Sequence, residues 1–104
     1  VIKEGWLLKK SSGGKKSWKK RYFVLFNGVL LYYKSKKKKS SSKPKGSIPL
    51  SGCTVREAPD SDSDKKKNCF EIVTPDRKTL LLQAESEEER KEWVEALRKA
   101  IAKL

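Results

Sequence analysis

The sequence predicts a mainly β domain with one C-terminal α-helix: seven antiparallel strands form a barrel or sandwich, and the helix covers one of its openings. Three observations favour this fold class. Residues before position 85 fall into short runs of β-branched and aromatic residues, separated by turn formers. Asn27-Gly28 is a strong hairpin signal. After Ser86 the apolar period becomes helical. The 104 residues suffice for one domain, 1–104, with a single core.

The first three predicted strands form an antiparallel meander that local chemistry determines. Residues 4–10 and 18–26 are rich in aromatic and branched side chains, and the loop 11–17 between them joins the two strands as a hairpin. Asn27-Gly28 suits a type I′ turn, which needs positive φ at both positions. Residues 29–34 then form the third strand.

Four shorter strands follow a basic loop at residues 35–45, whose low complexity is typical of a solvated segment. Pro49 restricts the fourth strand to an edge or a bend, because proline cannot donate to the strand ladder. Pro75-Asp76-Arg77 is a tight turn between the last two strands. The four strands are predicted at residues 46–50, 53–56, 68–74 and 78–84.

Residues 87–104 are predicted to form one amphipathic helix. Ser86 and Glu89 have the spacing of a capping box. The apolar stripe is continuous around Trp93, so this residue is expected to plug the core rather than to anchor a partner. Charge pairs at i, i+4 support the helix: Glu87 with Lys91, and Glu95 with Lys99.

Cations share a strand face with core residues in the first hairpin. Because alternate side chains of a strand point the same way, Lys9 lies with Leu7, and Lys19 and Arg21 lie with Phe23. Each of these two strands must therefore run from the buried interior of the barrel to an open end, where its cations lie at the rim. If the helix covers one end of the barrel, this rim surrounds the other end. Cations above an apolar floor predict a site for an anion.

Positive charge is concentrated in the first half of the chain. Residues 1–50 hold fifteen Lys/Arg and one acid, whereas residues 51–104 hold eleven Lys/Arg and twelve acids. The two halves therefore carry +14 and −1 of the net charge of +13. This asymmetry predicts a dipolar domain whose positive surface faces a polyanion.

The composition argues against catalysis and metal binding. The chain has no His and no G-x-S-x-G motif, and its acids lie away from the predicted cation site. A zinc site would need carboxylates in place of imidazole. We therefore expect no enzyme activity, no metal and no cofactor. No apolar leader or run of about 18 apolar residues is visible, so Cys53 and Cys69 are expected to be reduced.

The chain resembles a pleckstrin-homology (PH) domain along nearly all of its length. Each motif alone is weak, but their occurrence in this order is specific. The resemblance implies a seven-stranded, strongly bent barrel with a C-terminal helix, and membrane phosphoinositides as the typical ligand. The motifs are Glu4-Gly5-Trp6-Leu7-Leu8-Lys9, Trp18-Lys19-Lys20-Arg21-Tyr22-Phe23-Val24-Leu25, Leu31-Tyr32-Tyr33, Gly46-Ser47-Ile48-Pro49-Leu50, Asn68-Cys69-Phe70-Glu71-Ile72 and the closing helix with Trp93.

The resemblance also implies particular ligand residues. Lys9 with Lys19 and Arg21 matches the family's pattern of a first-strand Lys followed by Lys/Arg-x-Arg. Tyr33 is a candidate hydrogen-bond donor to a phosphate, or else a core residue. Lys45 and Arg77 are candidate contacts to the headgroup, or else ordinary loop charges. Non-specific contact with an anionic leaflet, worth about 1 kcal/mol for each Lys near it, is expected from Lys15, Lys16, Lys36, Lys37, Lys38 and Lys39.

The leading functional prediction is a non-catalytic, monomeric module that binds phosphoinositide headgroups and is recruited to the cytoplasmic face of membranes. The lysine run and the lack of Met and His also resemble a designed family consensus, in which case the protein would be a scaffold without a selective ligand. A protein-interaction module is a further alternative. A nucleic-acid partner is not expected, because base stacking needs exposed aromatics and most of these fall on core faces.

Overall fold

The computed structural model describes residues 2–10, 17–35, 43–58 and 67–104. Seven strands form one antiparallel sheet in the order β4-β3-β2-β1-β7-β6-β5. Within these described ranges there is one helix, α2, which covers Glu87–Ala102. The fold class is as predicted, with strand bounds that differ by at most one residue. The strands are β1 Lys3–Lys10, β2 Trp18–Phe26, β3 Val29–Tyr33, β4 Gly46–Pro49, β5 Thr54–Glu57, β6 Cys69–Val73 and β7 Thr79–Gln83.

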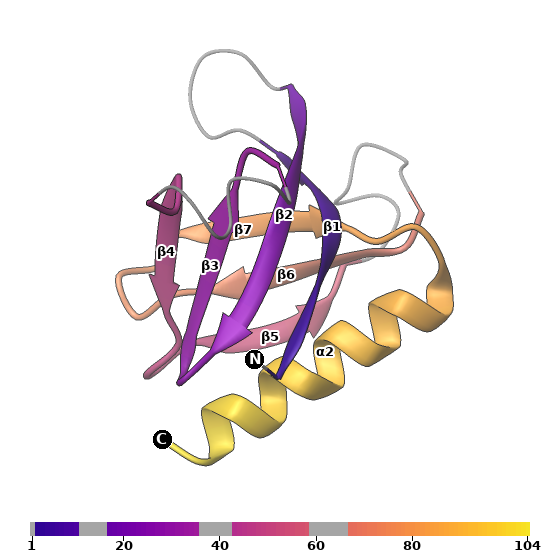
Figure 1. Cartoon of the computed structure of the whole chain (residues 1–104). Helices are drawn as coiled ribbons and strands as arrows, with labels where there is room; N and C mark the ends of the chain where they lie inside the picture. The colour runs from indigo at the N-terminus through magenta and orange to yellow at the C-terminus, as the bar shows by residue number, and fades with distance from the viewer. Residues whose placement is uncertain (1, 11–16, 36–42, 59–66) are drawn as a thin grey trace.

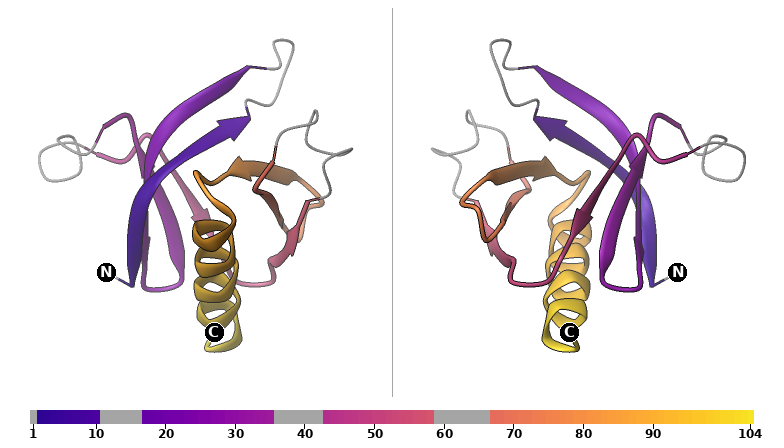
Figure 2. Two further views of the ribbon diagram at one scale, coloured as in Figure 1. Left: turned by 90° about the vertical axis from the view of Figure 1, so that its right-hand side faces the viewer. Right: turned by 90° about the vertical axis from the view of Figure 1, so that its left-hand side faces the viewer.

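The sheet folds over to make two layers. In Figure 1, β1 to β4 form the front layer, and β5 to β7 cross behind it at a steep angle. Figure 2 shows α2 lying between the lower ends of the two layers. The helix therefore covers one open end, and the end at which β1 finishes and β2 begins lies opposite to it.

The turn at Asn27-Gly28 joins β2 and β3 as predicted. Asn27 and Gly28 have φ of 50° and 73°, which confirms positive φ at both turn positions. Phe26 pairs directly with Val29 across this two-residue turn. The register of β3 on β2 follows from this pair, because each further residue on one strand faces the preceding residue on the other.

The helix begins as predicted and ends earlier. Ser86 Oγ accepts a hydrogen bond from the Glu89 N–H at 3.1 Å, so the N-cap is confirmed. The two i, i+4 pairs are also present, Glu87–Lys91 at 3.7 Å and Glu95–Lys99 at 2.8 Å. The expected end at residue 104 is wrong: the Leu104 N–H bonds to the Ile101 carbonyl three residues back, which closes the last turn tightly.

The inner faces of both layers and the apolar stripe of α2 form the main core. Trp93 is 2% exposed, which confirms that it plugs the core. Arg98 ties the helix to β5, because its Nε and Nη2 both donate to the Val55 carbonyl, at 3.1 and 3.0 Å. The other buried members are Leu7, Phe23, Leu25, Leu30, Leu50, Cys53, Val55, Phe70, Ile72, Leu82, Ala84, Val94, Leu97 and Ala100.

Two smaller apolar clusters lie outside this core. One contains Tyr22, Val24 and Tyr33, with Trp6 and Leu31 packed against it. The other contains Ala58, Cys69 and Leu81, with Trp18 packed against it. Since Tyr22 and Val24 alternate with the core residues of β2, the first cluster lies on the outer face of that layer.

Both cysteines are free and buried, so the expectation that they are unpaired is confirmed. Burial, together with the nearby charge of Asp76, raises the pKa of the Cys53 thiol. Cys69 is completely buried in its cluster. In the described part of the chain, no helix has the length and apolar character needed to cross a membrane.

Candidate anion-binding site

The inner face of the β1–β2 hairpin carries three cations next to the core. Lys9 pairs directly with Lys19, and Leu7 pairs with Arg21. These residues share a face with Phe23, which is fully buried. The structure therefore brings together the three cations named from the sequence, at the end of the hairpin away from α2.

Lys9 lies in an environment that disfavours its own charge. Burial, and then the adjacent positive charge of Arg21, lower the pKa of the Lys9 ammonium. Its Nζ lies 5.4 Å from the centroid of the Tyr32 ring, whose π face offsets part of this penalty. Within the described ranges, neither Lys9 nor Arg21 forms an ion pair with an acid. An anion between them would supply the missing opposite charge.

Lys9 opens into a pocket of about 430 Å³ between the two layers. Lys9, Lys10, Tyr32 and Ile48 line it from the front layer, and Thr74, Lys78, Thr79 and Leu80 line it from the β6–β7 region. Its volume is within the usual range for small-molecule sites. Ile48 and Leu80 contribute the apolar surface, and the three lysines and two threonines contribute the polar groups.

The charge of its lining distinguishes this pocket from the other surface hollows. A hollow of about 320 Å³ on the outer face combines Lys20 with Glu85, and another of about 310 Å³ along α2 contains Glu92 and Glu95. Among the hollows formed by the described residues, the one at Lys9 has cations and no acid in its lining. It is therefore the candidate site for a multiply charged anion.

Tyr32, rather than Tyr33, lies with the cations. Tyr32 pairs with Phe23, so its ring is on the inner face, with ring centroids 5.4 Å apart. Tyr33 pairs with Tyr22 and is buried in the outer cluster, on the other side of the sheet from Lys9. Counting the register back from Asn27-Gly28 would have identified Tyr32, because a two-residue turn fixes which residues face each other.

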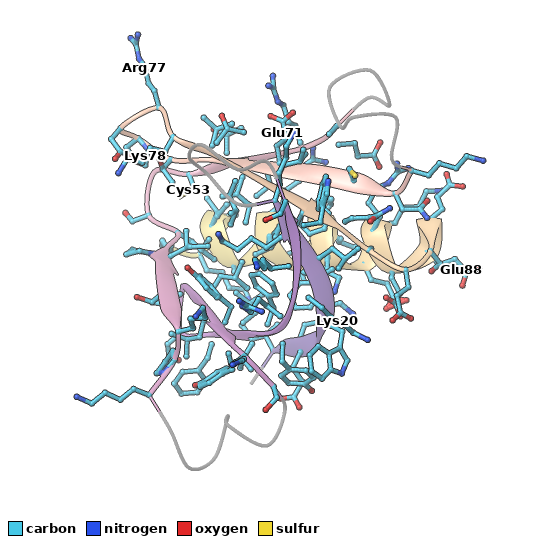
Figure 3. The ribbon with its side chains drawn as sticks, turned by 90° about the horizontal axis from the view of Figure 1, so that it is seen from above. Lys20, Cys53, Glu71, Arg77, Lys78 and Glu88 are labelled. Atoms are coloured by element: carbon cyan, nitrogen blue, oxygen red, sulfur yellow. The ribbon has the colours of Figure 1, made fainter. Side chains whose placement is uncertain are left out.

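The two candidates from the later loops differ in position. The Lys45 N–H bonds to the Tyr32 carbonyl at 2.8 Å, so Lys45 lies just before β4 on the Tyr32 side of the pocket, with an exposed side chain. Arg77 adopts a φ of 66° in the β6–β7 turn, and its side chain points away from the domain in Figure 3. Lys78, which the sequence interpretation did not name, lines the pocket in its place.

The β6–β7 turn holds the backbone of Lys78 at the pocket edge, while its side chain is exposed. Its carbonyl accepts a hydrogen bond from the Thr74 N–H at 2.9 Å, and its Nζ lies 3.8 Å from Asp76 Oδ2. Both groups are exposed, so this ion pair leaves Lys78 free to move toward a ligand. The remaining candidates, Lys15, Lys16, Lys36, Lys37, Lys38 and Lys39, lie outside the described residues.

Comparisons with known proteins agree with this fold. Src kinase-associated phosphoprotein 1 from Homo sapiens is 38% identical over 98 residues, which cover 93% of this chain and 27% of that protein. Pleckstrin from Canis lupus familiaris is 39% identical over 61 residues, 56% of this chain and 17% of that protein. The chain thus spans about a sixth to a quarter of the length of these relatives.

Solved structures are similar over most of the chain. One is the C-terminal PH domain of pleckstrin in complex with D-myo-Ins(1,2,3,4,5)P5, with a TM-score of 0.77, 36% identity, and coverage of 95% of this chain and 96% of that one. Another is the human PH domain of pleckstrin homology domain-containing protein family A member 5, with a TM-score of 0.82, 31% identity, and coverage of 98% and 77%. The PH domain family model matches residues 1–102. The chain belongs to the PH domain family.

Proposed function

We propose that this domain binds inositol phosphates and phosphoinositide headgroups in the pocket at Lys9. The observation that carries the proposal is the position of Lys9, which is partly buried and lines a pocket with no acid among its described lining residues. Lys19 and Arg21 adjoin Lys9 on the hairpin but are not lining residues of this pocket. A bound polyphosphate would stabilise both cations. The similar pleckstrin domain that was solved with an inositol pentakisphosphate supports the same ligand class.

Each residue of the site has a role that follows from its chemistry. Arg21 offers a planar fork for bidentate contact with a phosphate, whereas Lys9 and Lys19 act as point charges that accept varied phosphate positions. The Tyr32 hydroxyl donates a hydrogen bond to a phosphate oxygen. Lys45 and Lys78 extend the positive surface on opposite sides. None of these roles involves bond making, and we propose a binding module rather than an enzyme.

Membrane recruitment follows from this ligand if the headgroup belongs to a lipid. The lysines at positions 15, 16 and 36–39 would add attraction to an anionic leaflet, at about 1 kcal/mol for each residue near the surface. This second contribution needs no pocket. We therefore propose a peripheral, monomeric domain on the cytoplasmic face of membranes.

A second candidate function rests on the charge asymmetry. The first half of the chain carries +14, much of it in repetitive loop sequence of the kind left by averaging a family. Such a domain would be a designed basic scaffold that binds anionic surfaces without selecting a headgroup. It differs from the leading proposal in one measurable respect, because its binding would depend on total surface charge rather than on phosphate arrangement.

Co-sedimentation with liposomes separates the two candidates. Vesicles containing phosphatidylinositol bisphosphate are compared with phosphatidylserine vesicles of equal total charge over a salt series. The leading proposal expects stronger binding to the first vesicles, and loss of this preference in Arg21→Ala. Arg77→Ala is the matched control, because it removes the same charge from an exposed turn. Equal binding to both vesicles, abolished by salt and weakened only by changing Lys36, Lys37, Lys38 and Lys39 to Ser, would instead identify the scaffold.

A further inference from the structure

We propose that Gly46 is a positioning residue of the anion site, because its missing side chain provides the space in which the Tyr32 phenol lies. This inference rests on the proposed function, in which the Tyr32 hydroxyl contacts a phosphate. Gly46 itself contributes no group to a ligand. Its effect on binding would be transmitted through the position of one ring.

The Tyr32 phenol occupies the space that a side chain at position 46 would need. Gly46 is the first residue of β4 and pairs directly with Tyr32 of β3. A Cβ added to Gly46 would lie 2.3 Å from both Cζ and Oη of Tyr32, and 2.6 Å from Cε1. Ordinary contact begins at 3.4 Å, so any larger residue forces the phenol end to retreat by about 1 Å. The ring thus lies over the backbone of Gly46.

Two further contacts place the other parts of the same ring. Phe23 lies 5.4 Å away with an interplanar angle of 33°, on the core side. Lys9 Nζ lies 5.4 Å from the ring centroid, on the pocket side. The ring is thus in contact with Phe23, Lys9 and the backbone of Gly46, and Tyr32 is one of the residues that line the pocket. A side chain at position 46 would occupy the space of the phenol end and displace it from this position.

The substitution Gly46→Ala should leave the fold intact. The backbone of Gly46 is outside the left-handed region, so alanine is sterically allowed there. The clash involves the far end of a side chain that can rotate, rather than another backbone segment. Alanine is also the better strand residue, because glycine in a strand loses more conformational entropy. Gly46→Ala therefore moves Tyr32 at little cost in stability.

Gly5→Ala is the matched control. Gly5 also lies in a strand, and a Cβ there would meet only Trp93 Cζ2, at 3.8 Å, which is an ordinary contact. Both variants add one methyl group to a strand glycine. They differ in whether that methyl group meets Tyr32.

The test combines a ligand-free measurement with a binding measurement. In the NMR spectrum, the Lys9 side-chain protons should be shifted upfield by the Tyr32 ring current. Gly46→Ala should reduce this shift, and Gly5→Ala should leave it unchanged. In calorimetric titration with inositol 1,2,3,4,5-pentakisphosphate, Gly46→Ala should bind about tenfold more weakly, the effect of losing one weak hydrogen bond to a charged group. In a Tyr32→Ala background, Gly46→Ala should have no further effect.

Two results would overturn the inference. An unchanged Lys9 shift in Gly46→Ala would mean that β4 moves and the ring stays. Equal weakening of binding in the Tyr32 and Tyr32→Ala backgrounds would mean that Gly46 acts by another route. If the parent domain binds no inositol phosphate, the proposed function fails, and the inference about binding fails with it. The Lys9 shift would still report separately whether Gly46 positions the ring.

Discussion

Replacing Lys9 with methionine should have opposite effects on binding and on stability. Lys9 is the cation whose charge the free domain disfavours, through burial and through the charge of Arg21. Methionine keeps a flexible unbranched stem of similar length and removes the charge. If Lys9 is held in place for a ligand, its removal should cost affinity while the free domain loses an unfavourable interaction.

The magnitudes follow from the surroundings of Lys9. The substitution relieves desolvation and repulsion but loses the contact with the Tyr32 ring, worth about 0.5–1 kcal/mol. We therefore expect the free energy of unfolding to be unchanged or raised by up to about 1 kcal/mol, and Tm to rise by no more than roughly 5 °C. Binding should lose one charged contact of about 1.5–3 kcal/mol, which weakens Kd roughly 10- to 150-fold.

Thermal unfolding and calorimetric titration with inositol pentakisphosphate measure the two effects. Lys20→Met is the control, because Lys20 lies on the outer face of β2 with its Nζ 5.0 Å from the Trp6 ring. It removes one charge and one cation–π contact without touching the pocket. If Lys9→Met lowers stability by more than Lys20→Met does, Lys9 has a structural role and the reasoning is wrong. If both variants bind equally well, the site lies elsewhere.

Three further predictions concern the site and the fold. Tyr32→Phe should weaken binding of inositol pentakisphosphate about tenfold, by loss of one hydrogen bond to a charged group, whereas Tyr33→Phe should leave it unchanged in the same titration; the reverse order would restore Tyr33 as the ligand. Ser86→Ala should lower the free energy of unfolding by about 1 kcal/mol, through loss of the N-cap, and urea unfolding would show this; an unchanged midpoint would mean that the cap is replaced by water. Burial and the hydrogen bond to Glu4 raise the pKa of Tyr22 to about 12 from its ordinary value of 10.0, so the unfolded state loses this proton first. The contribution of Tyr22 to the free energy of unfolding is therefore complete below about pH 10 and is lost as the pH rises toward about 12. Urea unfolding should show that the free energy of unfolding of Tyr22→Phe declines less steeply than that of the parent over this range.

Most of the fold could be predicted because its determinants are local. Asn27-Gly28 sets a two-residue hairpin by its own backbone preferences, and the period of two in β2 assigns Phe23 and Arg21 to one face before any partner strand is known. Ser86 marks the start of the helix in the same way. The end of the helix was not encoded as clearly, because Leu104 fits the apolar stripe although it lies beyond the last turn.

The arrangement of the candidate site could be predicted in part for the same reason. Lys9, Lys19 and Arg21 belong to one hairpin, so strand alternation alone brings them together. The sequence also contains the information that places Tyr32 on the face of these cations, because the two-residue turn at Asn27-Gly28 sets Tyr32 opposite Phe23. Tyr33, the candidate named from the resemblance, lies opposite Tyr22 on the other face.

The sequence by itself thus determined the strands, the first meander, the helix start and the face that carries the cations, because each depends on residues close together in the chain. Only the tertiary structure decided that Lys78 rather than Arg77 lines the pocket. Lys78 and Lys9 line the same pocket because β1 pairs with β7, where Lys9 faces Leu82, and no local preference specifies that pairing. Arg77 has positive φ in the β6–β7 turn, and its side chain points away from the domain. The pocket closes between distant segments, and its lining was therefore set by the packing of the two layers.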